Sequence, residues 1–447
     1  MLIHDPSDLD PASVERIELS SALLDRLAAI RAEVLAALAG GDPVYGVNTG
    51  MGALSKRRLT VDEQRRHQRN LLLGRAVGGP PWLPADEARA VLIGRLRTFL
   101  TGDAGVSVEL VQQLVSYLNS GQLPEIPAAG SGSAGEIIPL AHAFGPLDFD
   151  LGPKEGIALL AGIPGATGRA ALQVTRTRRL ADHLTAVAAG SIAVIGANRD
   201  PYHPIAARGD DVLADELARL RELAGPEPEP RSLQAPVSFR VAGHVTAHVR
   251  RTLGQLAEAV DRAFTGVTDS PAYLDGEFVG TAGFHGIDLA AHCDHLTAAL
   301  AHAAEVSTAR LHRLLDPAVT GLPAQLAHDP GPQAGLVAVH KRAVATSHAL
   351  RRLTLPSAIS TAETSNGQED VQSFSWEAVG GLADAVRLTR EVTACELLAV
   401  HQAFALSKRP VPPGLRELLQ AVADVVPPIE ADRPFGQDLT RLLESVL

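Results

Sequence analysis

The sequence predicts an all-α protein, built as a bundle of long helices with a loop-rich helical lobe at its N-terminal end. Apolar residues recur at helical spacing along much of the 447-residue chain, whereas alternating β-branched runs bounded by turns are nearly absent. With 46% hydrophobic residues, the chain can bury a large core. We expect an N-terminal helical lobe with active-site loops over 1–195 and a C-terminal long-helix bundle over 196–447.

The individual elements follow from periodicity and capping residues. One apolar stripe predicts a helix over 21–40 that ends at two glycines, and Ser107 is expected to cap a helix that ends at Gly121. The proline-rich stretch 225–236 predicts a loop. Longer helices, which should pack on one another, are expected at about 155–190, 240–268, 286–316, 332–354 and 376–406.

Charge and cysteine content exclude several classes of partner. The net charge is −11, and Lys and Arg are dispersed among acidic residues, so we expect neither nucleic acid nor an anionic membrane as a partner. Only two cysteines occur, and no N-terminal signal or run of 18 or more uncharged apolar residues is present. These features predict a cytoplasmic protein.

Three loops combine glycine with polar residues between apolar helices, at 44–55, 128–142 and 363–376. They contain no phosphate-binding motif of the G-x-x-x-x-G-K-[ST] type, and no strand precedes them as a dinucleotide site requires. A nucleotide site is therefore not expected.

Taken in order, these loops and their neighbours resemble motifs of the aromatic amino acid and histidine ammonia-lyase family. The matching stretches are "YGVNTGMG" (45–52), "QRNLLLGRAVG" (68–78), "GSGSAGEIIPLAH" (130–142), "KEGIALLAG" (154–162), "QAPVSFR" (234–240), "VTDSP" (267–271), "GFHG" (283–286) and "NGQED" (366–370). The resemblance implies the ammonia-lyase/fumarase-like helical fold and a homotetramer whose active sites are shared between subunits. It also implies a small-molecule carboxylate as substrate.

Members of that family cyclise an Ala-Ser-Gly triplet into methylidene-imidazolone, an electrophile that activates a poor leaving group. The present loop is one residue shorter than the family pattern and has no such triplet. When "AGE" is aligned with the family's "SGD", Ala134 takes the serine position and Gly135 follows it. The surrogates Gly132-Ser133-Ala134 and Gly130-Ser131-Gly132 misplace the cyclising atoms, so we expect the cofactor to be absent.

Other family positions are also changed: Arg75 replaces a histidine, Ala161 an asparagine, Val237 a tyrosine and Gly283 an asparagine. These changes do not favour histidine, phenylalanine or tyrosine as the substrate.

The retained residues still predict a lyase-type enzyme. By resemblance, Tyr45 is expected to be the base or proton donor, and Arg240 to hold the substrate carboxylate through two hydrogen bonds. Glu369 and Lys341 would form a second acid–base pair, as in an ergothionase-like branch of the family that works without the electrophile. The further residues expected to bind substrate are Asn48, Gly52, Arg75, Phe284, His285 and Gln368.

The sequence is also compatible with other functions. The chain would be an ammonia-lyase or aminomutase if Ser131 or Ser133 cyclises, or an inactive homologue that only binds a ligand. Lys341 fits a solvated helix face equally well. His285, Asp288, His292 and His295 share one helical stripe, but about 15 Å of helix separates the first from the last, so no metal site is expected.

Overall fold

A computed structural model describes residues 1–227, 233–359, 362–407 and 409–447. The chain divides into two compact units, each built from three segments: unit 1 comprises 1–175, 256–294 and 356–381, and unit 2 comprises 176–255, 295–355 and 382–447. The predicted boundary at 195 does not coincide with this division, because long helices pass from one unit into the other. The loop expected at 225–236 lies partly outside the described residues, which omit 228–232.

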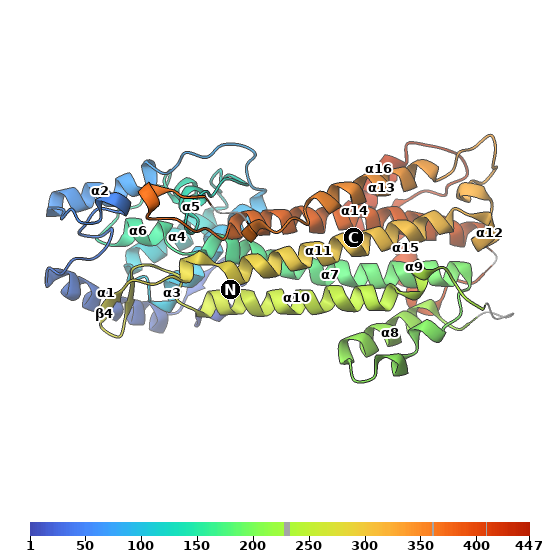
Figure 1. The fold of residues 1–447 in the computed structure, drawn as a ribbon, viewed down its shortest axis with the longest axis horizontal. Helices are drawn as coiled ribbons and strands as arrows, with labels where there is room; N and C mark the ends of the chain where they lie inside the picture. The colour runs from blue at the N-terminus through green and yellow to red at the C-terminus, as the bar shows by residue number, and fades with distance from the viewer. Residues whose placement is uncertain (228–232, 360–361, 408) are drawn as a thin grey trace. The chain divides into compact units, whose positions relative to one another are not determined.

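The described residues are mainly helical, as predicted. Unit 1 contains β1 (Leu2–Ile3), β2 (Glu18–Leu19), α1 (Ser21–Ala39), α2 (Val61–Leu73), α3 (Ala85–Thr101), α4 (Val108–Ser120), α5 (Ile137–Phe144), α6 (Glu155–Leu160), β3 (Ala272–Leu274) and β4 (Glu277–Val279). Unit 2 contains α8 (Asp211–Ala224), α9 (Val237–Arg240), α12 (Pro317–Thr320), α13 (Val337–Arg352), α15 (Arg416–Val425) and α16 (Phe435–Ser445). The helices shared by both units, labelled in Figure 1, are α7 (Pro164–Ile195), α10 (Ala242–Thr265), α11 (Ile287–Leu314) and α14 (Ser375–Leu406).

The segment expected as one helix at 155–190 is two helices. α6 ends at Leu160 and α7 starts at Pro164. Between them Gly162 has φ +80°, a left-handed conformation that breaks helical geometry, and proline is favoured in the first turn of a new helix. This break places residues 161 and 162 at the cavity described below.

Unit 1 is held by close backbone packing between α3 and the start of α7. A Cβ on Gly94 would lie 2.1 Å from the Pro164 carbonyl oxygen, and a Cβ on Gly168 would lie 2.1 Å from that of Ala90. Glycine is therefore required at both positions. The two short sheets are a parallel pair, β1 with β2, and an antiparallel hairpin, β3 with β4.

The core of unit 2 contains a buried ion pair between α11 and α14. The Glu396 carboxylate accepts hydrogen bonds from Arg310 Nε at 2.7 Å and Nη2 at 2.9 Å, and from the Ser191 hydroxyl of α7 at 2.6 Å. The charges are paired and multiply hydrogen-bonded, the condition under which burial is tolerated.

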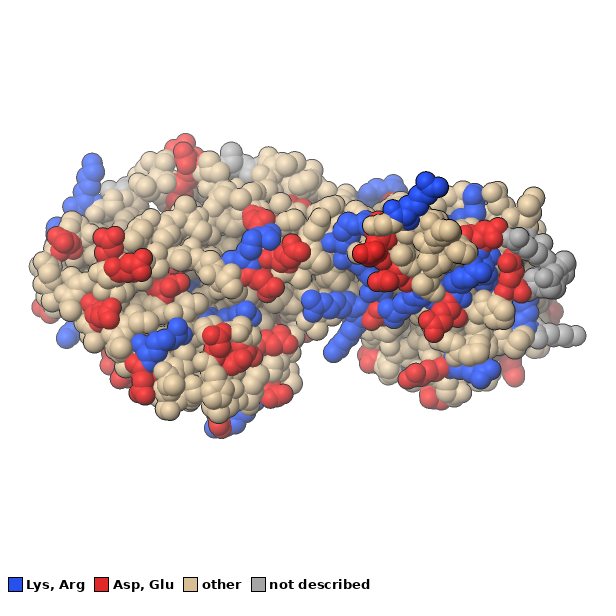
Figure 2. All heavy atoms as spheres, turned by 90° about the horizontal axis from the view of Figure 1, so that it is seen from below, with Lys and Arg blue, Asp and Glu red and all other residues tan. Residues whose placement is uncertain are grey.

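Among the described residues, one stretch, Glu155–Ile195, which contains α6 and α7, is long and apolar enough to span a membrane by length and composition alone. Within the protein, 89% of its apolar window is buried, which is typical of a core helix. On the face drawn in Figure 2, acidic and basic side chains are interspersed, as the sequence predicted.

Candidate active site

A cavity of about 360 Å³ in unit 1 brings together loops that are far apart in the sequence. Its lining residues are Tyr45, Met51, Ala134, Ile137, Ile157, Leu160, Ala161, Gly162, Ser270, Phe284, Gln368, Glu369, Asp370 and Val371. A mainly apolar pocket with a few polar groups on one cluster of loops is the usual form of a small-molecule site.

Tyr45 lies in a tight turn at this cavity. A Cβ on Gly46, which has φ +68°, would lie 2.4 Å from the Ile157 side chain, so the turn requires glycine. The Tyr45 phenol oxygen accepts a hydrogen bond from the Gly52 N–H at 2.8 Å, and 38% of the residue is exposed. An N–H donor at this oxygen stabilises negative charge that develops when the phenol gives up its proton.

Asn48, expected to bind substrate, holds this turn together instead. Its Oδ1 accepts a hydrogen bond from the Val44 N–H at 2.8 Å, and its Nδ2 donates one to the Asp42 carbonyl at 2.7 Å. The side chain is buried and is not part of the cavity lining. These bonds give Asn48 a role in holding the turn that carries Tyr45, and substrate contact by Asn48 stays a prediction. Gly52 contributes its backbone N–H to the Tyr45 phenol oxygen.

Glu369 is held in place by its own loop. The Thr364 N–H donates to the Glu369 carbonyl at 2.8 Å, and the Thr364 hydroxyl donates to the Glu369 carboxylate at 3.1 Å. Ser365 and Asn366 have φ +55° and +56°, a conformation that costs energy in residues other than glycine and occurs where the surroundings hold the backbone. The loop thus fixes a carboxylate at the cavity.

Two carboxylates hold the glycine- and serine-rich loop. Glu377 accepts hydrogen bonds from the Gly130 N–H at 3.1 Å, the Ser131 N–H at 2.8 Å and the Ser131 hydroxyl at 2.7 Å. Glu369 accepts one from the Ala134 N–H at 3.1 Å. Within residues 130–135 of this loop, Ala134 lines the cavity.

These residues do not fit the electrophile at the cavity. Ala134, which the motif resemblance aligns with the family's serine, presents a methyl group to the cavity. Ser131 is 1% exposed and its hydroxyl is bound to Glu377. The Ser133 hydroxyl is buried and finds no hydrogen-bond partner in the described part of the chain. The positive φ values of Gly132 and Gly135, +50° and +78°, shape a turn that presents Ala134.

Arg75 brings a positive charge to the same group of residues. Its guanidinium donates to the Leu71 carbonyl at 3.3 Å and contacts the Met51 sulfur at 3.8 Å. Burial lowers the pKa of Arg75, and the electrostatic interactions of Arg75 with Tyr45 and Glu369 oppose this shift. The cation is therefore electrostatically coupled to both proposed acid–base groups.

A buried ion pair lies next to the cavity wall, and sequence reasoning missed it. Lys154 Nζ lies 2.6 Å from Asp269 Oδ2, and both side chains are almost fully buried. Lys154 has φ +76°, and burial lowers its pKa. Burial also lowers the pKa of Arg95, to about 10, and the nearby Asp269 carboxylate opposes only part of this shift. The signal lay in the stretches 154–162 and 267–271, which matched the family without suggesting a role for either residue.

Glu136 follows the loop directly and is fully buried. Its carboxylate accepts hydrogen bonds from the N–H groups of Gly165 and Ala166, at 2.8 and 2.7 Å, at the start of α7. Burial raises its pKa to about 7, although these hydrogen bonds and Arg95 oppose the rise. A carboxylate at a helix N-terminus is favourable, since the exposed N–H groups and the helix dipole both attract negative charge.

The structure places the other predicted residues in different surroundings. Phe284 and Gln368 line the cavity. His285 follows Phe284 in the chain, and its backbone carbonyl accepts a hydrogen bond from the Ser373 hydroxyl. Arg240 and Lys341 belong to unit 2 and are not part of the lining. Arg240 donates to the Ala235 carbonyl at 3.0 Å, and Lys341 is exposed on α13. In the described ranges, no three His, Cys, Asp or Glu side chains are arranged to hold a metal ion.

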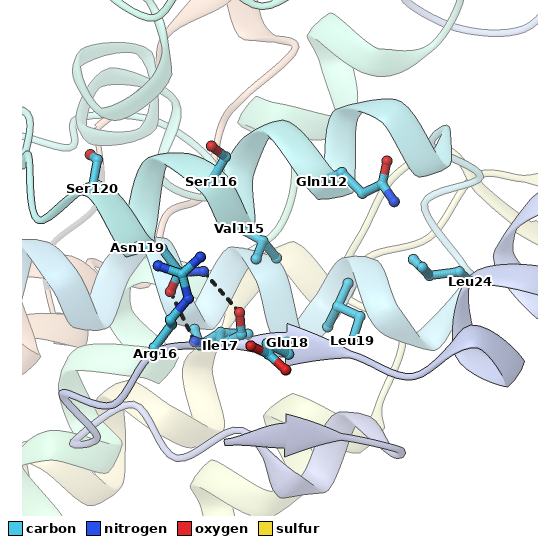
Figure 3. Close-up of a pocket in the computed structure, with 10 residues that line it drawn as sticks. All are labelled: Arg16, Ile17, Glu18, Leu19, Leu24, Gln112, Val115, Ser116, Asn119 and Ser120. Atoms are coloured by element: carbon cyan, nitrogen blue, oxygen red, sulfur yellow. Dashed lines mark hydrogen bonds between the residues drawn. The ribbon is translucent and has the colours of Figure 1, made fainter.

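A second hollow in unit 1, of about 530 Å³, lies between β2 and α4 (Figure 3). Asn119 both accepts from the Ile17 N–H and donates to the Ile17 carbonyl, each at 2.8 Å. Its amide is used to attach β2 to α4, which is a structural role.

Comparison with known proteins identifies the family. The model of the aromatic amino acid lyase family matches residues 9–148 and 145–425. Histidine ammonia-lyase of Deinococcus radiodurans is 30% identical over 96% of this chain and 89% of its own length, and that of Streptomyces griseus is 31% identical over 88% and 84%.

Solved structures share the fold. Tyrosine aminomutase from Streptomyces globisporus has a TM-score of 0.91 at 24% identity, covering 99% of this chain and 95% of that one. Ergothionase from Treponema denticola has a TM-score of 0.89 at 23% identity, covering 99% and 96%. This likeness confirms the predicted all-helical fold class. From its motifs and these matches, the chain belongs to the aromatic amino acid lyase family, within the histidine ammonia-lyase superfamily.

Proposed function

We propose that this chain is a lyase that works without methylidene-imidazolone. It would act on a small amino-acid-derived carboxylate by proton abstraction and β-elimination, or by the reverse addition or a cyclisation. One observation carries the proposal: the loop residue that lines the cavity beside Tyr45 and Glu369 is Ala134, which has no hydroxyl to lose.

The remaining groups at the cavity can carry out acid–base chemistry. Tyr45 and Glu369 line the same cavity, and each is positioned by a hydrogen bond from a backbone N–H. One takes the substrate proton and the other protonates the leaving group, while the nearby Arg75 cation balances negative charge. Without an electrophile, such a pair suffices when the proton is already acidic or the leaving group is already good.

The assembly and the second binding group are part of the same proposal. The homotetramer that the resemblance implies would bring residues of neighbouring subunits to each cavity. We assign Arg240, as the carboxylate anchor, and Lys341 to that group of residues. A guanidinium suits the role because its planar fork matches both oxygens of a carboxylate.

Intact mass and one substitution test the proposal. We expect the native chain to have its unmodified mass, whereas cyclisation would lower it by about 36 Da, the two waters lost in forming the electrophile. Once a substrate is found by screening amino acids for unsaturated products, Tyr45→Phe should lower kcat by about 100-fold or more, the range of a lost acid–base group. Tyr117→Phe on α4 is the matched control. Undiminished turnover by Tyr45→Phe would refute the mechanism.

A specific observation favours one second candidate, an ammonia-lyase or aminomutase with the triplet Gly132-Ser133-Ala134. The Ala134 nitrogen, which would have to attack, already donates its hydrogen to a carboxylate, and the Ser133 hydroxyl has no partner among the described residues. This candidate predicts the mass deficit, near-ultraviolet absorbance of the ring and loss of both in Ser133→Ala. Ser131→Ala is the control that separates the two serines.

A further inference from the structure

Arg75 is a half-buried cation whose hydrogen bonds are poor. One contact is a carbonyl at 3.3 Å, and the other is the Met51 sulfur at 3.8 Å, although a thioether is a weak acceptor. Within the described residues, Arg75 forms no salt bridge with a carboxylate. A guanidinium in this state has donors available for an anion that arrives from the cavity.

Met51 connects this cation to the cavity. Met51 itself lines the cavity, as do Tyr45 and Glu369, the two groups whose electrostatic interaction with Arg75 opposes the effect of burial on its pKa. A methionine side chain is unbranched and flexible, so it can yield to a ligand at small cost. A carboxylate oxygen is a much stronger acceptor than the sulfur that it would replace.

The chemistry of elimination explains why an anion would bind here. When the carbon that loses a proton also carries a carboxylate, the electron pair of the broken C–H bond spreads into that carboxylate. The resulting aci-carboxylate carries two negative charges, and a fixed guanidinium stabilises it more strongly than it stabilises the substrate. Such a substrate has an acidified proton and needs no protein-derived electrophile.

We infer that the substrate is an amine with two carboxylates, and that Arg75 binds the carboxylate on the carbon that loses its proton. This inference rests on the proposed function. Tyr45 or Glu369 takes the proton, and the electron pair of the C–H bond forms the carbon–carbon double bond. The bond from the neighbouring carbon to nitrogen breaks with its pair, so an ammonium substrate releases a neutral amine and an unsaturated dicarboxylate.

The rest of the cavity is apolar and fits the hydrocarbon part of the substrate. Ile137, Ile157, Leu160, Phe284 and Val371 line it. A four-carbon dicarboxylate occupies only part of about 360 Å³, so a hydrocarbon substituent on the nitrogen or on the carbon chain can be accommodated.

Binding of three probes to the full-length protein tests the inference without any turnover. Calorimetry would compare succinate, butyrate, which is a monocarboxylate of equal length, and 3-nitropropionate, whose nitronate form has the planar shape and the two negatively charged oxygens of the aci-carboxylate. We expect succinate to bind more tightly than butyrate, and 3-nitropropionate more tightly than succinate. Arg75→Gln should weaken succinate binding about 10- to 100-fold, the effect of losing a charged hydrogen-bond pair, and leave butyrate unchanged.

Controls and contrary outcomes are defined by the same set of measurements. Arg57→Gln removes an exposed arginine of unit 1, paired with Glu63 at 2.6 Å, and should change none of the affinities. Retained butyrate binding shows that Arg75→Gln keeps its cavity. Equal affinity for succinate and butyrate would overturn the inference, as would an unchanged affinity of Arg75→Gln for both succinate and 3-nitropropionate. In either case the proposed function stands if Tyr45→Phe still abolishes turnover.

Discussion

Glu136 should make the stability of this protein depend on pH in a direction opposite to that of most carboxylates. Burial raises its pKa from 4.5 to about 7, so between these values the folded chain binds a proton that the unfolded chain does not. The free energy of unfolding contributed by this group is therefore highest below pH 4.5 and decreases as the pH rises to about 7. Since a tenfold change in proton affinity is worth about 1.4 kcal/mol, the total decrease is about 3 kcal/mol.

Glu136→Gln removes the titrating group and makes this contribution measurable. Urea denaturation of both proteins at several values between pH 4.5 and 7.5 gives the difference in unfolding free energy. We expect the wild type to lose about 3 kcal/mol relative to the variant across this range. Glu109→Gln, at an exposed position of α4, serves as the control, and its difference from the wild type should stay constant. A wild type that gains stability relative to Glu136→Gln as the pH rises would refute the reasoning.

Three other substitutions probe the packing around the cavity. Lys154→Met should lower the unfolding free energy by about 3–5 kcal/mol, because it leaves the buried Asp269 carboxylate unpaired. Urea denaturation measures this loss, and a loss below about 1 kcal/mol would contradict the prediction. Gly156→Ala should be destabilising by about 1–3 kcal/mol, because its Cβ would lie 2.3 Å from the Gln68 carbonyl oxygen of α2; an unchanged melting temperature would count against it. Glu377→Gln should accelerate amide hydrogen exchange at Ser131, whose N–H it now binds at 2.8 Å; equal rates in both proteins would exclude this contact.

Local signals in the sequence predicted most of the helices. The helix expected over 21–40 is α1, Ser21–Ala39, and the expected cap at Ser107 accepts a hydrogen bond from the Leu110 N–H at 3.1 Å. Such elements depend on nearest neighbours along the chain. The break at Gly162 was missed because apolar periodicity continues on both sides of it, so only the glycine and Pro164 could have indicated it.

The site was predicted in part, and mainly by resemblance. Tyr45 and Glu369 are 324 positions apart, and only the resemblance to a family pattern could place both in one site. The structure places both at one cavity. The Lys154–Asp269 pair, 115 positions apart, was missed because lysine and aspartate in separate loops usually face solvent. Burial depends on the whole fold, so no local sequence pattern indicates that these two side chains are buried.

The way the glycine- and serine-rich loop is held has a consequence for protein engineering. Grafting Ala-Ser-Gly onto this chain would be expected to fail as a simple three-residue replacement. By the motif resemblance the loop has one residue fewer than the family pattern, and carboxylates eight positions apart, Glu369 and Glu377, hold its two ends. A successful graft would have to lengthen the loop and redesign both carboxylate contacts together.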